Sequence, residues 1–151
     1  MIQRIYIDTS VIGGYFDEEF QITTQKLFDR LQKGEIIFVI SDLLELELLE
    51  APQHVMELLL NFPNDRFERI KLTEEAVKLA NTYIAEKVVG KASLQDCRHI
   101  ALATIFKVDV LVSWNFKHIV NLDRIKGYNS VNLKYGYSLV EIRSPREIVE
   151  I

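Results

Sequence analysis

The chain has 151 residues, of which 48% are hydrophobic and 26% are charged, with six Gly and three Pro. This composition excludes a disordered, collagen-like or low-complexity chain and predicts one well-filled core. The length fits a single domain over residues 1–151 and is too short for two domains of ordinary size. A formal charge of −4 argues against a protein that coats nucleic acid with a broadly positive surface.

The single cysteine, Cys97, limits the kinds of site that the chain can build. One thiol forms no intramolecular disulfide and no cysteine-rich zinc site. The three histidines lie in separate segments, without the spacing of a helical zinc site. The sequence shows no signal peptide and no apolar stretch of about 18 residues, so we expect a cytoplasmic protein that does not enter a membrane.

The first half of the sequence alternates strand-like and helix-like segments. An apolar, β-branched strand over Ile2–Ile7 ends at Asp8, and we expect Thr9 or Ser10 to cap a short helix there. The next expected elements are a helix over Thr23–Lys33, a strand over Glu35–Ile40 closed by Ser41, a leucine-rich helix over 42–50 broken at Ala51-Pro52, and a helix to about Leu60.

The second half continues the same alternation. The expected elements are a strand over Arg66–Leu72, a helix from Thr73 that ends by Gly90, a helix after Ser93, a strand over Val108–Val112, a last strand over about Tyr137–Arg143, and a turn from Pro145. Ser93 and Asp96 have the spacing of a capping box. Alternating strands and helices predict βαβ crossovers, so we expect an α/β fold, a three-layer α/β/α sandwich with a mainly parallel central sheet.

Oxygen-bearing side chains follow two of the clearest strands. Asp8 follows the first strand and Asn115 follows the strand that ends at residue 112, and ligands of open α/β sheets bind beyond such strand ends. Asp96 lies in the first turn of its helix, while Glu45 and Glu47 lie on the helix after the second strand. Clustered carboxylates need a cation, and oxygen ligands select Mg²⁺ or Mn²⁺, ions that support attack on a phosphodiester.

Each of these residues also has a purely structural interpretation. An Asp after a strand is often a turn residue, Asp96 can simply cap its helix, and Asn115 can be a turn former. Glu45 and Glu47 lie about 200° apart on a helix, so they cannot both face one site. The leucines that surround this helix leave open whether Glu45, Glu47 or Glu50 faces it.

Together, these segments resemble the PIN domain family, a group of metal-dependent nucleases that includes the toxins of bacterial and archaeal toxin–antitoxin pairs. The resemblance covers nearly the whole chain in the family's order. The matching segments are Ile5-Tyr6-Ile7-Asp8-Thr9-Ser10, Ile40-Ser41 with Glu47 and Leu48-Leu49, Asp96-x-x-His99-x-Ala101-x-Ala103, and Leu111-Val112-Ser113-Trp114-Asn115.

The resemblance implies a Mg²⁺- or Mn²⁺-dependent endoribonuclease with Asp8, Glu47 and Asp96 as metal ligands, and it selects Glu47 over Glu45. The cut would leave 5′-phosphate and 3′-hydroxyl ends. Asn115 stands where many members carry a fourth acid, so it would assist as an uncharged oxygen donor and a second metal would bind more weakly. This departure raises an alternative, a PIN-like binding or regulatory module with weak or no catalysis.

The resemblance also suggests supporting residues. Thr9 and Ser10 would hold the first aspartate or a metal-bound water, and Ser113 is a third supporting residue. We interpret His99 mainly as packing on its helix and Cys97 as a small buried neighbour. A phosphatase of the haloacid-dehalogenase type is disfavoured, because it needs a second aspartate at the position of Ser10.

The expected partners are an RNA substrate, a small antitoxin protein and a second copy of the chain in a homodimer. The apolar segment Leu43–Met56 is a candidate surface for such a partner, with ordinary core packing as the alternative. Basic residues near the proposed site are candidates for holding phosphates; they are Lys91, Arg98, Lys117 and Arg124.

Overall fold

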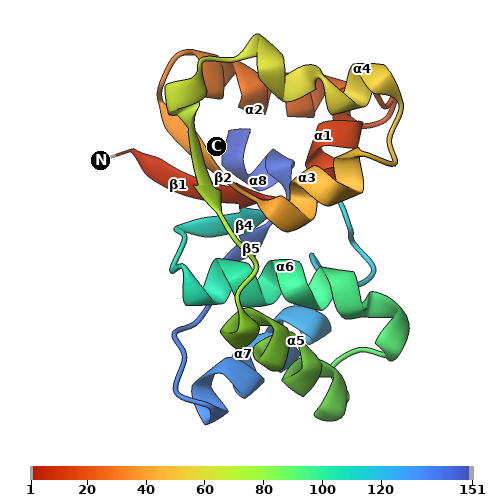
Figure 1. Cartoon of the computed structure of the whole chain (residues 1–151), viewed down its shortest axis with the longest axis vertical. Helices are drawn as coiled ribbons and strands as arrows, with labels where there is room; N and C mark the ends of the chain where they lie inside the picture. Colours follow the sequence, from red (N-terminus) through yellow and green to blue (C-terminus); the bar gives the residue numbers. More distant parts are fainter. Residues whose placement is uncertain (1, 150–151) are drawn as a thin grey trace.

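A five-stranded sheet, in which every strand pair is parallel, forms the centre of the computed structural model, which describes residues 2–149 (Figure 1). The strand order is β3-β2-β1-β4-β5. The strands are β1 (Gln3–Ile7), β2 (Ile36–Ser41), β3 (Phe67–Ile70), β4 (Val110–Val112) and β5 (Ile142–Arg143). Residues 1, 150 and 151 of the expected domain lie outside the described part of the chain.

Helices cover both faces of this sheet, so the predicted three-layer α/β/α sandwich is confirmed (Figure 1). One face carries α1 (Thr9–Gly14), α2 (Gln21–Gln32), α3 (Asp42–Leu48) and α8 (Pro145–Val149). The other face carries α5 (Glu74–Ala85), α6 (Leu94–Ile105) and α7 (Leu122–Lys134). Shorter elements complete the chain, namely α4 (Gln53–Met56) and the 3₁₀ turns Leu58–Asn61, Asn64–Arg66 and Lys91–Ser93.

The strands divide their side chains between two apolar cores. In β1, Tyr6 joins the core beneath α5, α6 and α7, whereas Ile5 and Ile7 join the core on the opposite face. In β2, Val39 and Phe38 separate in the same way. Because successive strand residues point to opposite faces and helices cover both faces, these strands read as continuous apolar runs in the sequence.

Side-chain caps fix the start of three helices. Ser41 Oγ accepts a hydrogen bond from the backbone N–H of Leu44 at 3.1 Å, at the start of α3. Thr73 caps α5 in the same way, and the Asn121 side chain caps α7. Such caps satisfy backbone donors that have no partner inside the helix. The cap at Ser41 begins α3 immediately after β2, which places the start of α3 at the carboxyl edge of the sheet.

Several expected element boundaries are wrong for local reasons. The helix expected to reach Leu60 is only the single turn of α4 followed by a 3₁₀ turn. The helix expected to continue toward Gly90 ends at Ala85, and Lys87 soon after it has a left-handed φ of 64°. The last strand pairs with β4 only at residues 142–143. Ser93 makes no capping hydrogen bond, and Asp8, rather than Thr9 or Ser10, is the residue at the cap position of α1.

Helix α7 was not expected from the sequence. It contains Gly127 in its middle and buries the polar side chain of Asn132, features that weaken a helical pattern. The glycine is needed because a Cβ at this position would lie only 2.7 Å from Val88 Cγ1. The side chain of Asn132 is satisfied by Tyr83, whose hydroxyl donates to Asn132 Oδ1 at 2.6 Å. Tertiary contacts therefore compensate for a weak local signal.

The strand order positions a site at the carboxyl ends of β1 and β4. The chain moves from β1 outward through β2 to β3, and it then crosses β1 to add β4 and β5 on the other side. Such a reversal of strand order is where open α/β sheets bind ligands. Asp8 follows β1 and Ser113 follows β4, so both residues lie at this point. Within residues 2–149, no helix is long and apolar enough to cross a membrane.

Two adjacent glycines of α1 give a stability test of the packing beside this site. A Cβ on Gly14 would lie 2.7 Å from ring atoms of Trp114 and 2.9 Å from Thr24 Oγ1, whereas a Cβ on Gly13 would meet nothing within 4 Å. We expect Gly14→Ala to lower the free energy of unfolding by about 1–3 kcal/mol through overpacking. Gly13→Ala should leave it unchanged or raise it by up to about 1 kcal/mol. Equal losses in the two variants, measured by urea denaturation, would contradict this packing.

Candidate functional site

All four residues proposed from the sequence as metal-site residues line one small cavity of about 130 Å³. They come from the end of β1, from α3, from α6 and from the loop after β4. The lining residues are Asp8, Thr9, Ser10, Glu47, Asp96, His99 and Asn115. Segments more than 100 residues apart in the sequence, at Asp8 and Asn115, therefore meet at the edge of the sheet.

The carboxylate of Asp8 is buried, with an exposed fraction of 4%. Ser10 Oγ donates to Asp8 Oδ1 at 2.6 Å, and Ser113 Oγ donates to Asp8 Oδ2 at 2.7 Å. Burial raises the pKa of Asp8, while the charge of His99 and these two hydroxyl donors oppose the rise. Because both carboxylate oxygens accept a hydrogen bond, the orientation of the carboxylate is fixed.

Backbone groups of the loop after β4 hold the two serines in turn. The N–H of Trp114 donates to Ser10 Oγ at 2.9 Å, and the N–H of Asn115 donates to Ser113 Oγ at 2.9 Å. Each hydroxyl accepts a backbone hydrogen bond and directs its own proton to Asp8. Ser10 and Ser113 therefore contact the Asp8 carboxylate directly, as a role in holding this side chain requires.

Glu47 reaches the cavity from α3 and is held by two donors. Thr9 Oγ1 donates to Glu47 Oε1 at 2.5 Å, and His99 Nε2 lies 2.7 Å from the same oxygen. Burial alone would raise the pKa of Glu47, but the hydrogen bond and charge of His99 and the hydrogen bond from Thr9 lower it overall. Both donors contact Oε1, which leaves Oε2 for other partners.

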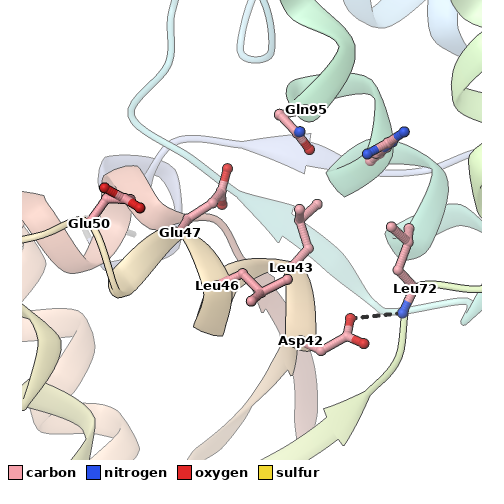
Figure 2. Close-up of a pocket in the computed structure, with 8 residues that line it drawn as sticks. Asp42, Leu43, Leu46, Glu47, Glu50, Leu72 and Gln95 are labelled. Carbon is pink, nitrogen blue, oxygen red and sulfur yellow. Dashed lines mark hydrogen bonds between the residues drawn. The ribbon is translucent and has the colours of Figure 1, made fainter.

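Helical periodicity did not show which of three glutamates faces the site, and the structure distinguishes them. Glu45 forms an ion pair with Arg69, 3.6 Å between Oε1 and Nε, and its side chain is 54% exposed. Glu50 lines a larger neighbouring cavity of about 520 Å³ together with Glu47, and Figure 2 shows both carboxylates on the same side of α3. Of these three acids, only Glu47 also lines the small cavity with Asp8.

His99 is the site residue that the sequence interpretation missed. Its side chain is 3% exposed, and its Nδ1 lies 2.6 Å from Tyr6 Oη, which lies 3.0 Å from Ser41 Oγ. When Tyr6 donates to Nδ1, Nε2 carries the proton that is donated to Glu47. The expectation of simple packing was therefore incomplete. The available signal was the spacing of three residues from Asp96, which places both side chains on one face of α6.

Asp96 is half-buried in the first turn of α6, where burial and then the negative charge of Asp8 raise its pKa. Asn115 Nδ2 donates to Asp96 Oδ2 at 3.3 Å. Asn115 Oδ1 accepts from the backbone N–H groups of Lys117 and His118 at 3.2 and 3.0 Å. Since only an oxygen can accept both N–H groups, the amide nitrogen is the atom that faces Asp96.

The donor set fits a hard cation that keeps most of its water. Within residues 2–149, no group of three or more His, Cys, Asp or Glu side chains is placed so that it could hold a metal ion. Mg²⁺, however, is usually bound through one or two carboxylates and several waters. Asp8 and Asp96 interact electrostatically, as the effect of Asp8 on the pKa of Asp96 shows. A cation between these oxygens would relieve their repulsion.

The basic residues expected near the site have different environments. Arg124 Nη1 donates to the backbone carbonyl of Val88, so it stabilises the turn after α5. Arg98 lines the larger cavity beside Glu47, and its buried Nε has no hydrogen-bond partner. Lys91 and Lys117 are exposed. Three of these four cations therefore remain as candidates for contact with a phosphate.

Comparisons with known proteins find the same fold at low sequence identity. No protein-family model and no curated protein matches the chain. A toxin–antitoxin complex from Klebsiella pneumoniae matches with 16% identity over 75% of this chain and 88% of that chain, with a TM-score of 0.54. VapBC2 from Rickettsia felis, bound to a DNA fragment from its promoter, matches with 12% identity over 93% and 98%, with a TM-score of 0.56.

DNA-bound VapBC from Salmonella typhimurium matches with 15% identity over 96% of this chain and 99% of that chain, with a TM-score of 0.58. At identities of 12% to 16%, these likenesses establish a common fold and no more. They agree with the resemblance that the four sequence motifs indicate. The chain has a PIN-like α/β/α fold.

The hydrogen-bonded chain from Tyr6 through His99 to Glu47 predicts coupled stability effects. We expect Tyr6→Phe to lower the free energy of unfolding by about 1–2 kcal/mol, because it leaves His99 Nδ1 without its partner. The loss should shrink by about 0.5 kcal/mol or more in a His99→Leu background. Tyr137→Phe, which removes an exposed hydrogen bond to Glu75, is the control and should lower the free energy of unfolding by about 0.5 kcal/mol or less. Additive effects of the Tyr6 and His99 substitutions in urea denaturation would contradict the coupling.

Proposed function

We propose that this protein is a Mg²⁺- or Mn²⁺-dependent endoribonuclease that hydrolyses RNA phosphodiester bonds. The observation that carries the proposal is the convergence of Asp8, Glu47 and Asp96 on one cavity at the reversal of strand order in a PIN-like fold. Oxygen-only donors of this kind suit Mg²⁺ and Mn²⁺, and these ions suit phosphodiester hydrolysis.

In this proposal, Asp8 and Asp96 hold the cation, and Glu47 contributes directly or through water. The bound cation would supply Lewis acidity that activates water and neutralises charge on the phosphate. Ser10 and Ser113 fix the Asp8 carboxylate by donating to both of its oxygens. The lowered pKa of Glu47 keeps that side chain ionised near neutral pH, with Oε2 available to orient a water molecule.

A specific observation favours a second candidate function, a PIN-like binding or regulatory module with weak catalysis. Asn115 brings no charge, and its Oδ1 is already used by two backbone N–H groups. It therefore contributes to the site by donating to Asp96 rather than by offering an oxygen. The two candidates differ in whether the acids that line the cavity suffice for cleavage.

We also propose a small antitoxin protein and a second copy of the chain as partners. The structural neighbours are described as toxin–antitoxin and VapBC complexes. The segment Leu43–Met56, named from the sequence as a partner surface, is mixed, because Leu44 is buried whereas Leu46 and Leu49 are more than 60% exposed. With Leu60, which is 81% exposed, these leucines provide apolar surface for a partner.

RNA cleavage with and without metal tests the main proposal. Wild-type protein should cleave single-stranded RNA with Mn²⁺ or Mg²⁺ and lose this activity in EDTA. Asp8→Asn should reduce the rate by about 100-fold or more. Asp29→Asn changes only an exposed carboxylate that pairs with Lys33, so this control should match the wild type. Equal cleavage by the wild type and Asp8→Asn, or cleavage unaffected by EDTA, would overturn the proposal.

The substitution Asn115→Asp tests the role of the missing fourth acid. The new carboxylate keeps the oxygen that accepts from the backbone but removes the donor to Asp96, so stability in EDTA should fall by about 1 kcal/mol. A saturating concentration of Mn²⁺ should then raise Tm by more than it does in the wild type, because the site gains a ligand charge. Asn81→Asp, at an exposed position of α5, is the control. An identical Mn²⁺-induced shift in all three proteins would show that residue 115 does not face the metal.

Light scattering during gel filtration tests the homodimer. We expect a particle with twice the chain mass of 17.6 kDa. A single species at 17.6 kDa over the micromolar range would show that the chain is a monomer.

A further inference from the structure

A third hollow adjoins the candidate site on the side of α1. Its volume is about 480 Å³, and its lining residues are Ser10, Gly13, Gly14, Asp17, Phe20, Trp114 and Asn115. Ser10 and Asn115 also line the small cavity that holds Asp8. The two hollows therefore share a wall, and we call this third hollow the aromatic pocket.

Two aromatic rings, those of Phe20 and Trp114, line the aromatic pocket, and a third ring, that of Phe116, lies beside them. Phe20 stacks on Trp114 with 4.2 Å between ring centroids and 22° between planes. The ring of Phe116 lies 6.0 Å from Trp114 and 6.4 Å from Phe20. The Arg146 guanidinium lies over the Trp114 ring, 5.5 Å from the ring centroid.

Core packing accounts for Trp114 and Phe20 but not for Phe116. Trp114 is buried, but Phe116 is 45% exposed although it directly follows the site residue Asn115. The wall of the pocket is open at Gly13, where an added Cβ would meet nothing within 4 Å. Exposed aromatic surface beside a polar site matches the way that proteins bind single-stranded nucleic acid, since each base presents a π-face for stacking.

The polar groups around the aromatic pocket indicate which part of a nucleotide lies where. Asp17 lines the pocket, and its Oδ1 accepts from the backbone N–H of Glu19 at 2.8 Å. Among residues 2–149, no donor contacts its second oxygen, which can accept from a ligand. A carboxylate repels a phosphate but accepts from the exocyclic amino group of a base. Lys117, next to Phe116, is exposed, and within residues 2–149 its ammonium makes no ion pair.

We propose that the aromatic pocket binds one unpaired nucleobase of the RNA, adjacent to the phosphate that a cation bound at Asp8 would hold. Phe20 and Phe116 stack on the base, and Asp17 accepts from an exocyclic amino group, so adenine, cytosine or guanine is preferred to uracil. Lys117 lies on the solvent side, near the RNA backbone. The inference rests on RNA being the substrate proposed above, and it adds a site that selects the base.

Trp114 provides a direct test because it is the only tryptophan of the chain. In EDTA and low salt, short oligoadenylate and oligocytidylate should change Trp114 fluorescence saturably, and oligouridylate should bind more weakly. Phe116→Ala should weaken oligoadenylate binding by about 5- to 100-fold, whereas Phe116→Tyr should retain it within about threefold because the aromatic face remains. Tyr135→Ala removes a similarly exposed ring at the end of α7 and is the matched control, with unchanged affinity expected.

The outcomes separate this inference from the proposed nuclease activity, because binding is measured without metal. RNA binding that depends on Phe116 supports the aromatic pocket even if the cleavage assay fails. Wild-type affinity in Phe116→Ala, equal losses in Phe116→Ala and Tyr135→Ala, or no binding of any oligonucleotide would overturn it. Equal affinity for oligoadenylate and oligouridylate would overturn the role of Asp17.

Discussion

The buried carboxylate of Asp8 constrains most of the surrounding structure. A charge with an exposed fraction of 4% costs several kcal/mol unless hydrogen bonds compensate it. Here Ser10 and Ser113 donate to its two oxygens, and the N–H groups of Trp114 and Asn115 hold those serines. The loop after β4 must therefore lie against the start of α1. The same contacts that satisfy Asp8 bring Asn115 to the cavity.

A second network orders the opposite wall of the cavity. His99 joins Tyr6 of β1 to Glu47 of α3, and Thr9 adds a further donor to the same glutamate oxygen. Asp96 lies one turn before His99 on α6, so one helix supplies both a proposed metal ligand and the residue that holds another. The acids therefore meet in fixed orientations, and the net charge of −4 is compatible with a site that becomes attractive to phosphate only when a cation is bound.

The sequence predicted the layers of the fold and the position of Asp8, because buried parallel strands form apolar runs that end in polar residues. It did not predict α7, since Gly127 weakens the helical pattern and is explained only by the close approach of Val88, which leaves no room for a Cβ. Helical periodicity did not show which of Glu45, Glu47 and Glu50 faces the site, and the family resemblance selected Glu47. The role of His99 was missed because its partner Tyr6 lies 93 residues away, and no local pattern encodes a hydrogen bond over that separation.

The most direct test of a metal-dependent site at Asp8 is a crystal structure determined after soaking in Mn²⁺, with anomalous diffraction used to locate the ion. The account predicts an anomalous peak in the small cavity, in direct contact with oxygens of Asp8 and Asp96 and lost in crystals of Asp8→Asn. A cavity without a peak at millimolar Mn²⁺, or a peak that persists unchanged in Asp8→Asn, would contradict the central claim.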